Sequence, residues 1–405
     1  MADGRVAAVA RRAWSRPALA IGIVYLLARL VTTGLLLGAS ALSTPSSRLG
    51  AHPMLGDMLM GWDAQWYWLT AVNGYPSTLP LTPSGDVAEN QWAFMPVYSY
   101  LSAALGTPLG SWGAGAILVS LVAGYLSCLV LFRMLRTRID PAAAMWAVVL
   151  FSCGPLAALF QVGYAESLFL LWLFLALWQV LRRRYAWLFL LIPLMGFTRP
   201  GVLAFALFLG LYGIWRLVPR RREPLSVREA VLIVAAALWA AVVGFAWQVV
   251  ASIATGDPSA YLTTELAWRR NWIADASSVF APFDGFLQAT AFWFTSWGLG
   301  PVTGYVVLGL VVAGVAALLL FEPHVRGLGV ELRLWTASYL LYLLAVFFPQ
   351  SSVFRLLVPV SPLWGALAAP RSLAWRIGVL VVALLGQWWW IYNMYGLGST
   401  YWQIP

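Results

Sequence analysis

Long apolar runs, eleven of them, constrain this chain more than any other feature of its sequence. A transmembrane helix needs about 20 mainly apolar residues. The chain is 61% hydrophobic and 10% charged, whereas soluble domains are about 25% charged. We therefore predict an all-α polytopic integral membrane protein with a single domain over residues 1–405. The predicted spans lie at about 17–42, 112–133, 141–161, 164–181, 185–198, 201–218, 227–252, 301–321, 333–348, 356–369 and 377–396.

The basic residues indicate the orientation in the membrane. All 25 are arginine, which favours GC-rich coding and a bacterial source. Short arginine clusters precede the first span and follow the second, fourth, sixth and tenth. Cytoplasmic loops are enriched in basic residues, so we predict a cytoplasmic N-terminus, an outer C-terminus and an inner (plasma) membrane location. The net charge of +10 then reflects topology, and no nucleic-acid partner is predicted.

Two long loops fall on the predicted outer side, at about 43–111 and 253–300. The first contains "GWDAQWYWLTAVNGYP" and "ENQWAFMPVYSYL", which predict two interfacial helices separated by a turn region at 76–85. The second contains "TTELAWRRNWIADASSVFAPFDGF". Both loops mix charged residues with tryptophan, a combination typical of surfaces that meet lipid headgroups or sugars.

Four charged residues on this side could carry chemistry: Asp63, Glu166, Arg199 and Arg355. A charge at membrane depth costs roughly 2.5–3.5 kcal/mol on insertion scales, so such residues usually face a cavity or a partner. Two acids and two arginines at one depth suggest a base together with an anion clamp, because guanidinium binds phosphate through two parallel hydrogen bonds. Arg355 has no acid near it in the sequence, which favours a phosphate-binding role.

The run "WDAQWYWLTAVNGYP…FMPVYSYL…GYAESLF…FTRPG" resembles the PIG-V family, glycosylphosphatidylinositol mannosyltransferase II and its bacterial relatives. The motifs cover roughly the first half of the chain; "FRLLVPVSP" is a weaker later match. The family's Phe-Phe-Pro stretch reads Phe94-Met95-Pro96 here. The resemblance implies a GT-C-like glycosyltransferase fold and an inverting transfer of mannose from a polyprenyl-phosphate donor. The family's catalytic acid lies in the first outer loop, where Asp63 matches it.

The expected partners are therefore a polyprenyl-phosphate sugar donor, a lipid or glycan acceptor and membrane lipids, with no cofactor and no metal site. If residues 61–76 are helical, Asp63, Trp66 and Tyr67 share one face. Asp63 is the predicted general base. The predicted substrate-binding residues are Trp62, Trp66, Tyr67, Glu89, Trp92, Tyr164, Glu166, Arg199, Arg269, Arg270 and Arg355.

A structural alternative stands beside each of these roles. Asp63 could cap an interfacial helix, and Glu166 could serve the N-terminus of the fourth span, where the helix dipole favours negative charge. Arg199 and Arg355 could form structural ion pairs. Arg269 and Arg270 could bind anionic headgroups, and Glu89 could be a solvated loop acid.

Two other functional classes also remain open. A transporter or flippase of lipid-linked sugars would show repeated halves and broken helices at the midplane, and no such repeat is evident. A non-catalytic scaffold subunit would keep the fold without needing Asp63. The sequence leaves the acceptor undetermined, and the sugar could be arabinose or glucose instead of mannose.

Overall fold

The computed structural model describes residues 17–218, 225–270, 280–347, 349, 352–400 and 402–405, without the side chains of residues 269 and 270. Within these ranges the chain is helical, and the only strand-like pairing is an isolated bridge between Leu81 and Val87. The predicted all-helical class is confirmed.

Five of the described helices are long and apolar enough to cross a membrane. They coincide with predicted spans. These helices are α2 (Pro17–Leu42), α6 (Trp112–Leu135), α11 (Val227–Thr255), α14 (Pro301–Phe321) and α19 (Leu373–Ile391), the last continued by η6 (Tyr392–Leu397).

The other six predicted spans correspond to shorter helical segments, so the count of eleven is not confirmed. Proline explains why two of these segments are short, because it removes a backbone hydrogen-bond donor and disrupts a helix interior. The predicted span at 141–161 stops at Ser152, shortly before Pro155, and Pro359 and Pro362 lie in a 3₁₀ turn. The segments are α7 (Pro141–Ser152) with η3 (Ala157–Phe160), α8 (Glu166–Leu181), η4 (Tyr185–Trp187) with α9 (Leu188–Gly196), α10 (Val202–Leu217), α16 (Val330–Val346), and η5 (Val358–Leu363) with α18 (Trp364–Ala368).

The loops predicted on the outer side are also helical. Pro96 occupies the first turn of its helix, where its missing N–H costs nothing. The two helices predicted within 43–111 correspond to α4 (Asp63–Asn73) and α5 (Pro96–Gly106); α3 (Leu55–Leu59) precedes them, η1 (Gln91–Ala93) lies between them and η2 (Thr107–Leu109) follows them. The second loop contributes α12 (Ala260–Arg270) and α13 (Asp284–Ser296). Two further short helices are α15 (Pro323–Gly327) and α17 (Val353–Leu356).

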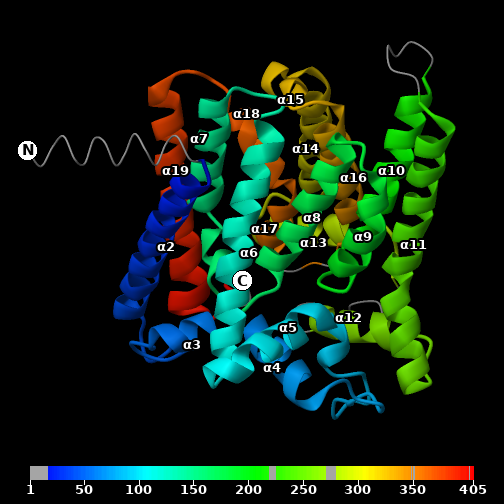
Figure 1. Ribbon diagram of the computed structural model, residues 1–405. Coiled ribbons are helices and arrows are strands. Elements are labelled where there is room, and N and C mark those ends of the chain that lie inside the picture. The colour runs from blue at the N-terminus through cyan, green and yellow to red at the C-terminus, as the bar shows by residue number, and fades with distance from the viewer. Residues whose placement is uncertain (1–16, 219–224, 271–279, 348, 350–351, 401) are drawn as a thin grey trace, which may run out of the picture.

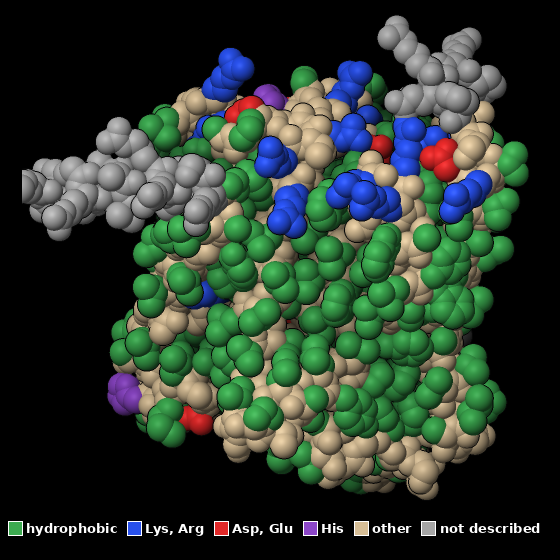
Figure 2. Space-filling model, viewed as in Figure 1, with side chains coloured by type: hydrophobic (Ala, Val, Ile, Leu, Met, Phe, Trp, Pro, Cys, Tyr) green, Lys and Arg blue, Asp and Glu red, His purple; other side chains and the backbone are tan. Residues whose placement is uncertain are grey.

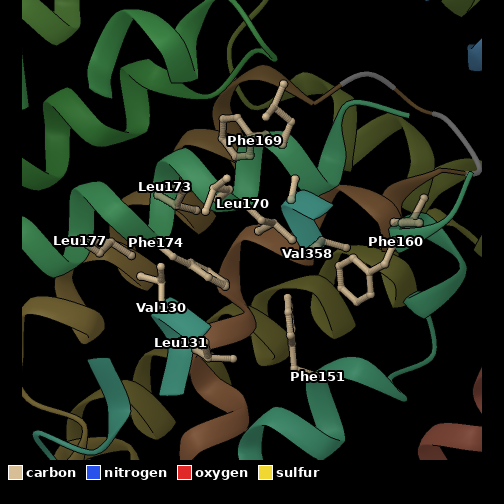
Figure 3. Close-up of a cluster of buried hydrophobic side chains, with 14 of the residues drawn as sticks. Val130, Leu131, Phe151, Phe160, Phe169, Leu170, Leu173, Phe174, Leu177 and Val358 are labelled. Carbon is tan, nitrogen blue, oxygen red and sulfur yellow. The ribbon is translucent and has the colours of Figure 1, made fainter. Parts of the chain in front are cut away.

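The apolar core lies where α6, α7 and α8 pack together, and Figure 3 shows its side chains interlocking. Phe151 packs against both Phe160 and Phe174, with ring centroids 4.8 and 5.7 Å apart. The break after α7 is held by Arg29 of α2, which donates hydrogen bonds to the carbonyls of Ser152 and Ala157. A buried guanidinium thus replaces the donors that a continued helix would have supplied.

Charge is distributed unevenly between the two ends of the molecule. Helices α3, α4, α5 and α12 gather at one end, here termed the loop end (Figure 1). Arginine side chains gather at the opposite end, the arginine end, and a broad hydrophobic band separates the two (Figure 2). This arrangement agrees with the alternating topology predicted from the sequence, in which the arginine end is cytoplasmic.

Cysteine labelling of intact cells tests that orientation. With Cys128 and Cys153 replaced by alanine, a cysteine at the exposed Ser84 of the loop end should react with a membrane-impermeant maleimide. A cysteine at Ala142, exposed in the first turn of α7, is the matched control and should react only after permeabilisation. The reverse pattern would refute the predicted topology.

Candidate active site

Asp63 is the first residue of α4, as the helical interpretation of its motif requires. The preceding residue, Trp62, has a φ of 54°, a left-handed conformation that is rare for bulky residues and is often found at functional sites. Trp62 is held there from elsewhere in the fold: its indole N–H donates to the Met394 carbonyl at 3.2 Å, and Arg48 lies 5.4 Å from its ring. The start of α4 is thereby fixed against η6.

The turn before α8 brings a second acid to the same place. The Gly163 amide donates to the Leu59 carbonyl at 2.9 Å, and Ser120 of α6 donates to the Val162 carbonyl at 2.7 Å. A Cβ on Gly163 would lie 3.0 Å from the Ala64 Cβ, so glycine permits this close approach. The turn is followed at once by Glu166, the first residue of α8, where the helix dipole favours its negative charge.

Four charged side chains form one ion-paired group, here termed the four-charge cluster: Asp63, Glu166, Arg199 and Arg355. Arg355 donates from Nη1 to Asp63 Oδ2 at 2.5 Å, and its Nε lies 3.3 Å from Glu166 Oε1. Arg199 donates from Nη1 to that same Glu166 oxygen. The predicted convergence of these residues is confirmed. Arg355 has no acid near it in the sequence, but folding supplies two carboxylates from distant segments.

Exposure separates the members of the four-charge cluster. The Glu166 side chain is 4% exposed and that of Arg355 is 9% exposed, whereas Asp63 keeps 21%. Burial alone would lower the pKa of Arg355, but the carboxylates of Asp63 and Glu166 outweigh it and raise that pKa. Arg355 is thus a permanent cation, and Asp63 is the more accessible acid.

Aromatic rings surround the four-charge cluster. Arg355 lies over the ring of the buried Tyr164, 5.4 Å from its centroid, a geometry that favours a cation. On α4, Trp66 stacks on Phe94 with centroids 5.9 Å apart, and the buried Tyr67 meets the same ring edge-on at 5.0 Å. These two rings share the Asp63 face of α4, as predicted.

The remaining predicted residues lie in different settings. Trp92 is 2% exposed, and its indole N–H donates to the Pro76 carbonyl at 3.0 Å, so it packs inside a small aromatic core and has no exposed face for the substrate binding predicted for it. Glu89 is half-buried beside η1. Arg269 and Arg270 end α12, and their side chains lie outside the described residues.

An apolar cavity is lined in part by the segment that follows Arg355. It measures about 450 Å³ and runs between the end of α7, the segment from α17 to α18, and α19. Phe354, next to Arg355 in α17, and Leu357, just after that helix, contribute to its wall, as do the core residues Phe151 and Phe160 (Figure 3). The segment that carries the buried cation Arg355 therefore also contributes side chains to a hydrophobic cavity.

Sequence reasoning missed a third acid, Glu265 of α12. It interacts electrostatically with Asp63 and Arg199, and desolvation by the surrounding protein raises its pKa to about 7. The signal was present in the sequence: Glu265 and Trp268 repeat the three-residue spacing of Asp63 and Trp66. The two tryptophans meet edge-on with ring centroids 5.3 Å apart.

Comparison with known proteins gives limited similarity. No family model matches the chain, and no curated protein matches it. Among solved structures, the Archaeoglobus fulgidus oligosaccharyltransferase complex with zinc and sulfate has a TM-score of 0.47 and 15% identity over 90% of this chain and 53% of its own. The same organism's oligosaccharyltransferase AglB, in complex with an inhibitory peptide and a dolichol-phosphate, has a TM-score of 0.41 and 14% identity over 97% and 57%. The chain spans about half the length of these proteins. The resemblance to PIG-V thus rests on the sequence motifs.

Proposed function

We propose that this protein is a GT-C-like membrane glycosyltransferase that moves mannose from polyprenyl-phosphate-mannose to an outer-facing lipid or glycan acceptor with inversion. One observation carries the proposal: Arg355 of the four-charge cluster lies in sequence between Phe354 and Leu357, which line an apolar cavity of about 450 Å³. A donor of this class likewise combines an apolar part with a charged part, because its hydrocarbon tail is joined to a phosphate. The motif resemblance around Asp63 supports the choice of sugar donor.

The cavity and the cation suit the two parts of such a donor. The isoprenoid tail would enter the cavity past Phe354 and Leu357, which places the phosphate at Arg355 between them in sequence. An arginine fork hydrogen-bonds a phosphate through two nitrogens at once. Asp63 and Glu166 pair with this guanidinium, so an arriving phosphate competes with carboxylates for it.

Asp63 is then placed to act as the general base. Its carboxylate takes the proton of the acceptor hydroxyl while that oxygen forms a bond to the sugar's anomeric carbon. The bond from this carbon to the phosphate oxygen breaks, and its electron pair leaves with the polyprenyl phosphate. A single displacement of this kind inverts the anomeric centre and needs no carboxylate nucleophile. Arg355 and Arg199 stabilise the negative charge that grows on the phosphate.

Reconstituted protein separates this proposal from transport. Proteoliposomes supplied with radiolabelled polyprenyl-phosphate-mannose and a membrane lipid extract should form a labelled product that resists the mild acid that cleaves the donor. A flippase would instead move intact donor between leaflets without forming product. Movement without product would overturn the proposed reaction, as would the absence of both.

Filling the cavity tests the proposed tail site. Val360 lines the cavity, so Val360→Trp should raise the KM for a long-chain donor by about 10-fold, the loss expected when about 1.4 kcal/mol of apolar contact is removed. A donor with a short tail should be affected less, because fewer of its carbons reach the blocked region. Val382→Trp on α19 is the matched control, since Val382 is 69% exposed. An equal effect of Val360→Trp on both donors would place the tail elsewhere.

A further inference from the structure

The second loop places a carboxyl group opposite the Asp63 helix. Glu265 and Trp268 lie three residues apart and so share one face of α12. That face meets α4, because Trp268 contacts Trp66 edge-on with centroids 5.3 Å apart. On each helix the acid lies three residues before the contacting tryptophan. The two acids, Asp63 and Glu265, therefore belong to the two helix faces that meet at this contact.

Helix α12 is anchored firmly enough to hold this position. The Asn90 side-chain amide donates to the Thr264 hydroxyl at 2.9 Å, and both side chains are buried. The Trp268 ring also lies 5.9 Å from Phe94, edge-on. Glu265 thus lies between Thr264, which is bonded to the first loop, and Trp268, which contacts α4.

The groups facing Glu265 explain its proton affinity. The pKa of Glu265 is raised to about 7 by the balance of four influences: desolvation, the largest, and Asp63 raise it, whereas a hydrogen bond from Tyr261 and the charge of Arg199 lower it. Tyr342 of α16 is a neutral neighbour coupled to the same carboxyl. Two further acids lie next to the elements packed against α12: Glu89 is two residues before η1, and Asp257 lies between α11 and α12. A carboxyl group with these properties exchanges its proton near neutral pH, the range in which acid–base groups work best.

We infer that Glu265 is a positioning residue that receives the acceptor's proton from Asp63 after transfer and restores the Asp63 carboxylate. The inference rests on the proposed function. The proton leaves the acceptor hydroxyl as the new glycosidic bond forms, passes from Asp63 to Glu265, and is released to water when Glu265 ionises again. The electron pair of the broken bond departs with the polyprenyl phosphate, so the step needs no further reactant. Arg355 regains its carboxylate partner in the same event.

The pH dependence of transfer tests this role. Wild-type kcat should fall as the pH drops below about 7, because a protonated Glu265 cannot take another proton. Glu265→Gln should lower kcat by about 10-fold or more near pH 8 and abolish this acid limb. Tyr261→Phe removes a hydrogen bond that lowers the pKa of Glu265, so its acid limb should move to higher pH. Glu331→Gln, at the distant pair with Arg138, is the control and should keep the wild-type profile.

Thermal stability supplies a readout that does not depend on turnover. The unfolded carboxyl loses its proton near pH 4.5, whereas the folded one keeps it to about pH 7. Unfolding therefore releases a proton between these values, and stability should fall as the pH rises through this window. The Tm of Glu265→Gln should not show this fall with rising pH, and at pH 8 it should exceed the Tm of the wild type.

The outcomes distinguish the two proposals. An unchanged rate and acid limb in Glu265→Gln, with Asp63→Asn inactive, would overturn the relay and leave the proposed function standing. An acid limb that Tyr261→Phe leaves in place would also count against the relay. No transfer by the wild-type protein from any polyprenyl-phosphate sugar would overturn the proposed function and the relay together.

Discussion

Asp63→Asn should reduce transfer by about 10²-fold or more, the usual share of a positioned general base. Asparagine keeps the size of the side chain and can accept a hydrogen bond from Arg355, but it cannot take up a proton. Arg355 also retains Glu166, whose Oε1 lies 3.3 Å from its Nε, so donor binding should persist. The loss is expected in kcat, with little change in KM, and is measured as the transfer rate per folded molecule.

Asp57→Asn provides the matched control for this substitution. Asp57 is an exposed acid on α3 in the same loop, and its carboxylate accepts a hydrogen bond from the Met54 amide at 3.1 Å. Its loss should reduce stability slightly and leave turnover per folded molecule unchanged. If Asp63→Asn behaved in this way, with a lower Tm and normal turnover, Asp63 would be a structural ion-pair partner and not the base.

Arg355→Lys should lower kcat/KM at limiting donor by about 10- to 100-fold. Lysine keeps the positive charge but offers a single ammonium in place of a planar fork, and one hydrogen bond to a charged group is worth about 1.5–3 kcal/mol. Arg355 contacts Asp63 through Nη1 and approaches Glu166 through Nε, so lysine cannot reach both carboxylates in the same geometry. Donor titrations with purified variants measure the effect.

Arg138→Lys is the control for the loss of an arginine fork. Arg138 pairs with Glu331 at 2.8 Å, with 32% of its side chain exposed, and exposed pairs contribute about 0–1 kcal/mol. This variant should transfer sugar at the wild-type rate. Wild-type affinity for the donor in Arg355→Lys would show that phosphate binds elsewhere and that Arg355 serves the fold.

The apolar helices and the convergence of the four-charge cluster could be predicted from sequence for a common physical reason. Charges are costly in hydrocarbon, so long apolar runs predict the helices. For the same reason, a charged residue next to such a run is expected to have a partner. Asp63, Glu166, Arg199 and Arg355 are such exceptions, and the structure joins them. The helical face shared by Asp63, Trp66 and Tyr67 followed from the 3.6-residue period alone.

Features that depend on contacts between distant segments could not be predicted in this way. Arg355 looked unpaired because its partners lie far away along the chain. Trp92 has an aromatic side chain of the kind that binds sugars, but it is enclosed by Tyr75 and Trp247. The span at 141–161 has the hydropathy of a continuous helix, yet its carbonyls are taken up by Arg29, which no local pattern indicates.

The ion pair between Asp63 and Arg355 joins residues 292 positions apart. Asp63 therefore leaves the ribosome long before Arg355 does. The pair between Glu166 and Arg199 spans only 33 positions, so it can form earlier in synthesis. Trp62, which fixes the start of α4, likewise waits for Met394. The four-charge cluster and the start of α4 are therefore completed only late in synthesis, so under the proposed function a growing chain would be inactive until these late segments have folded.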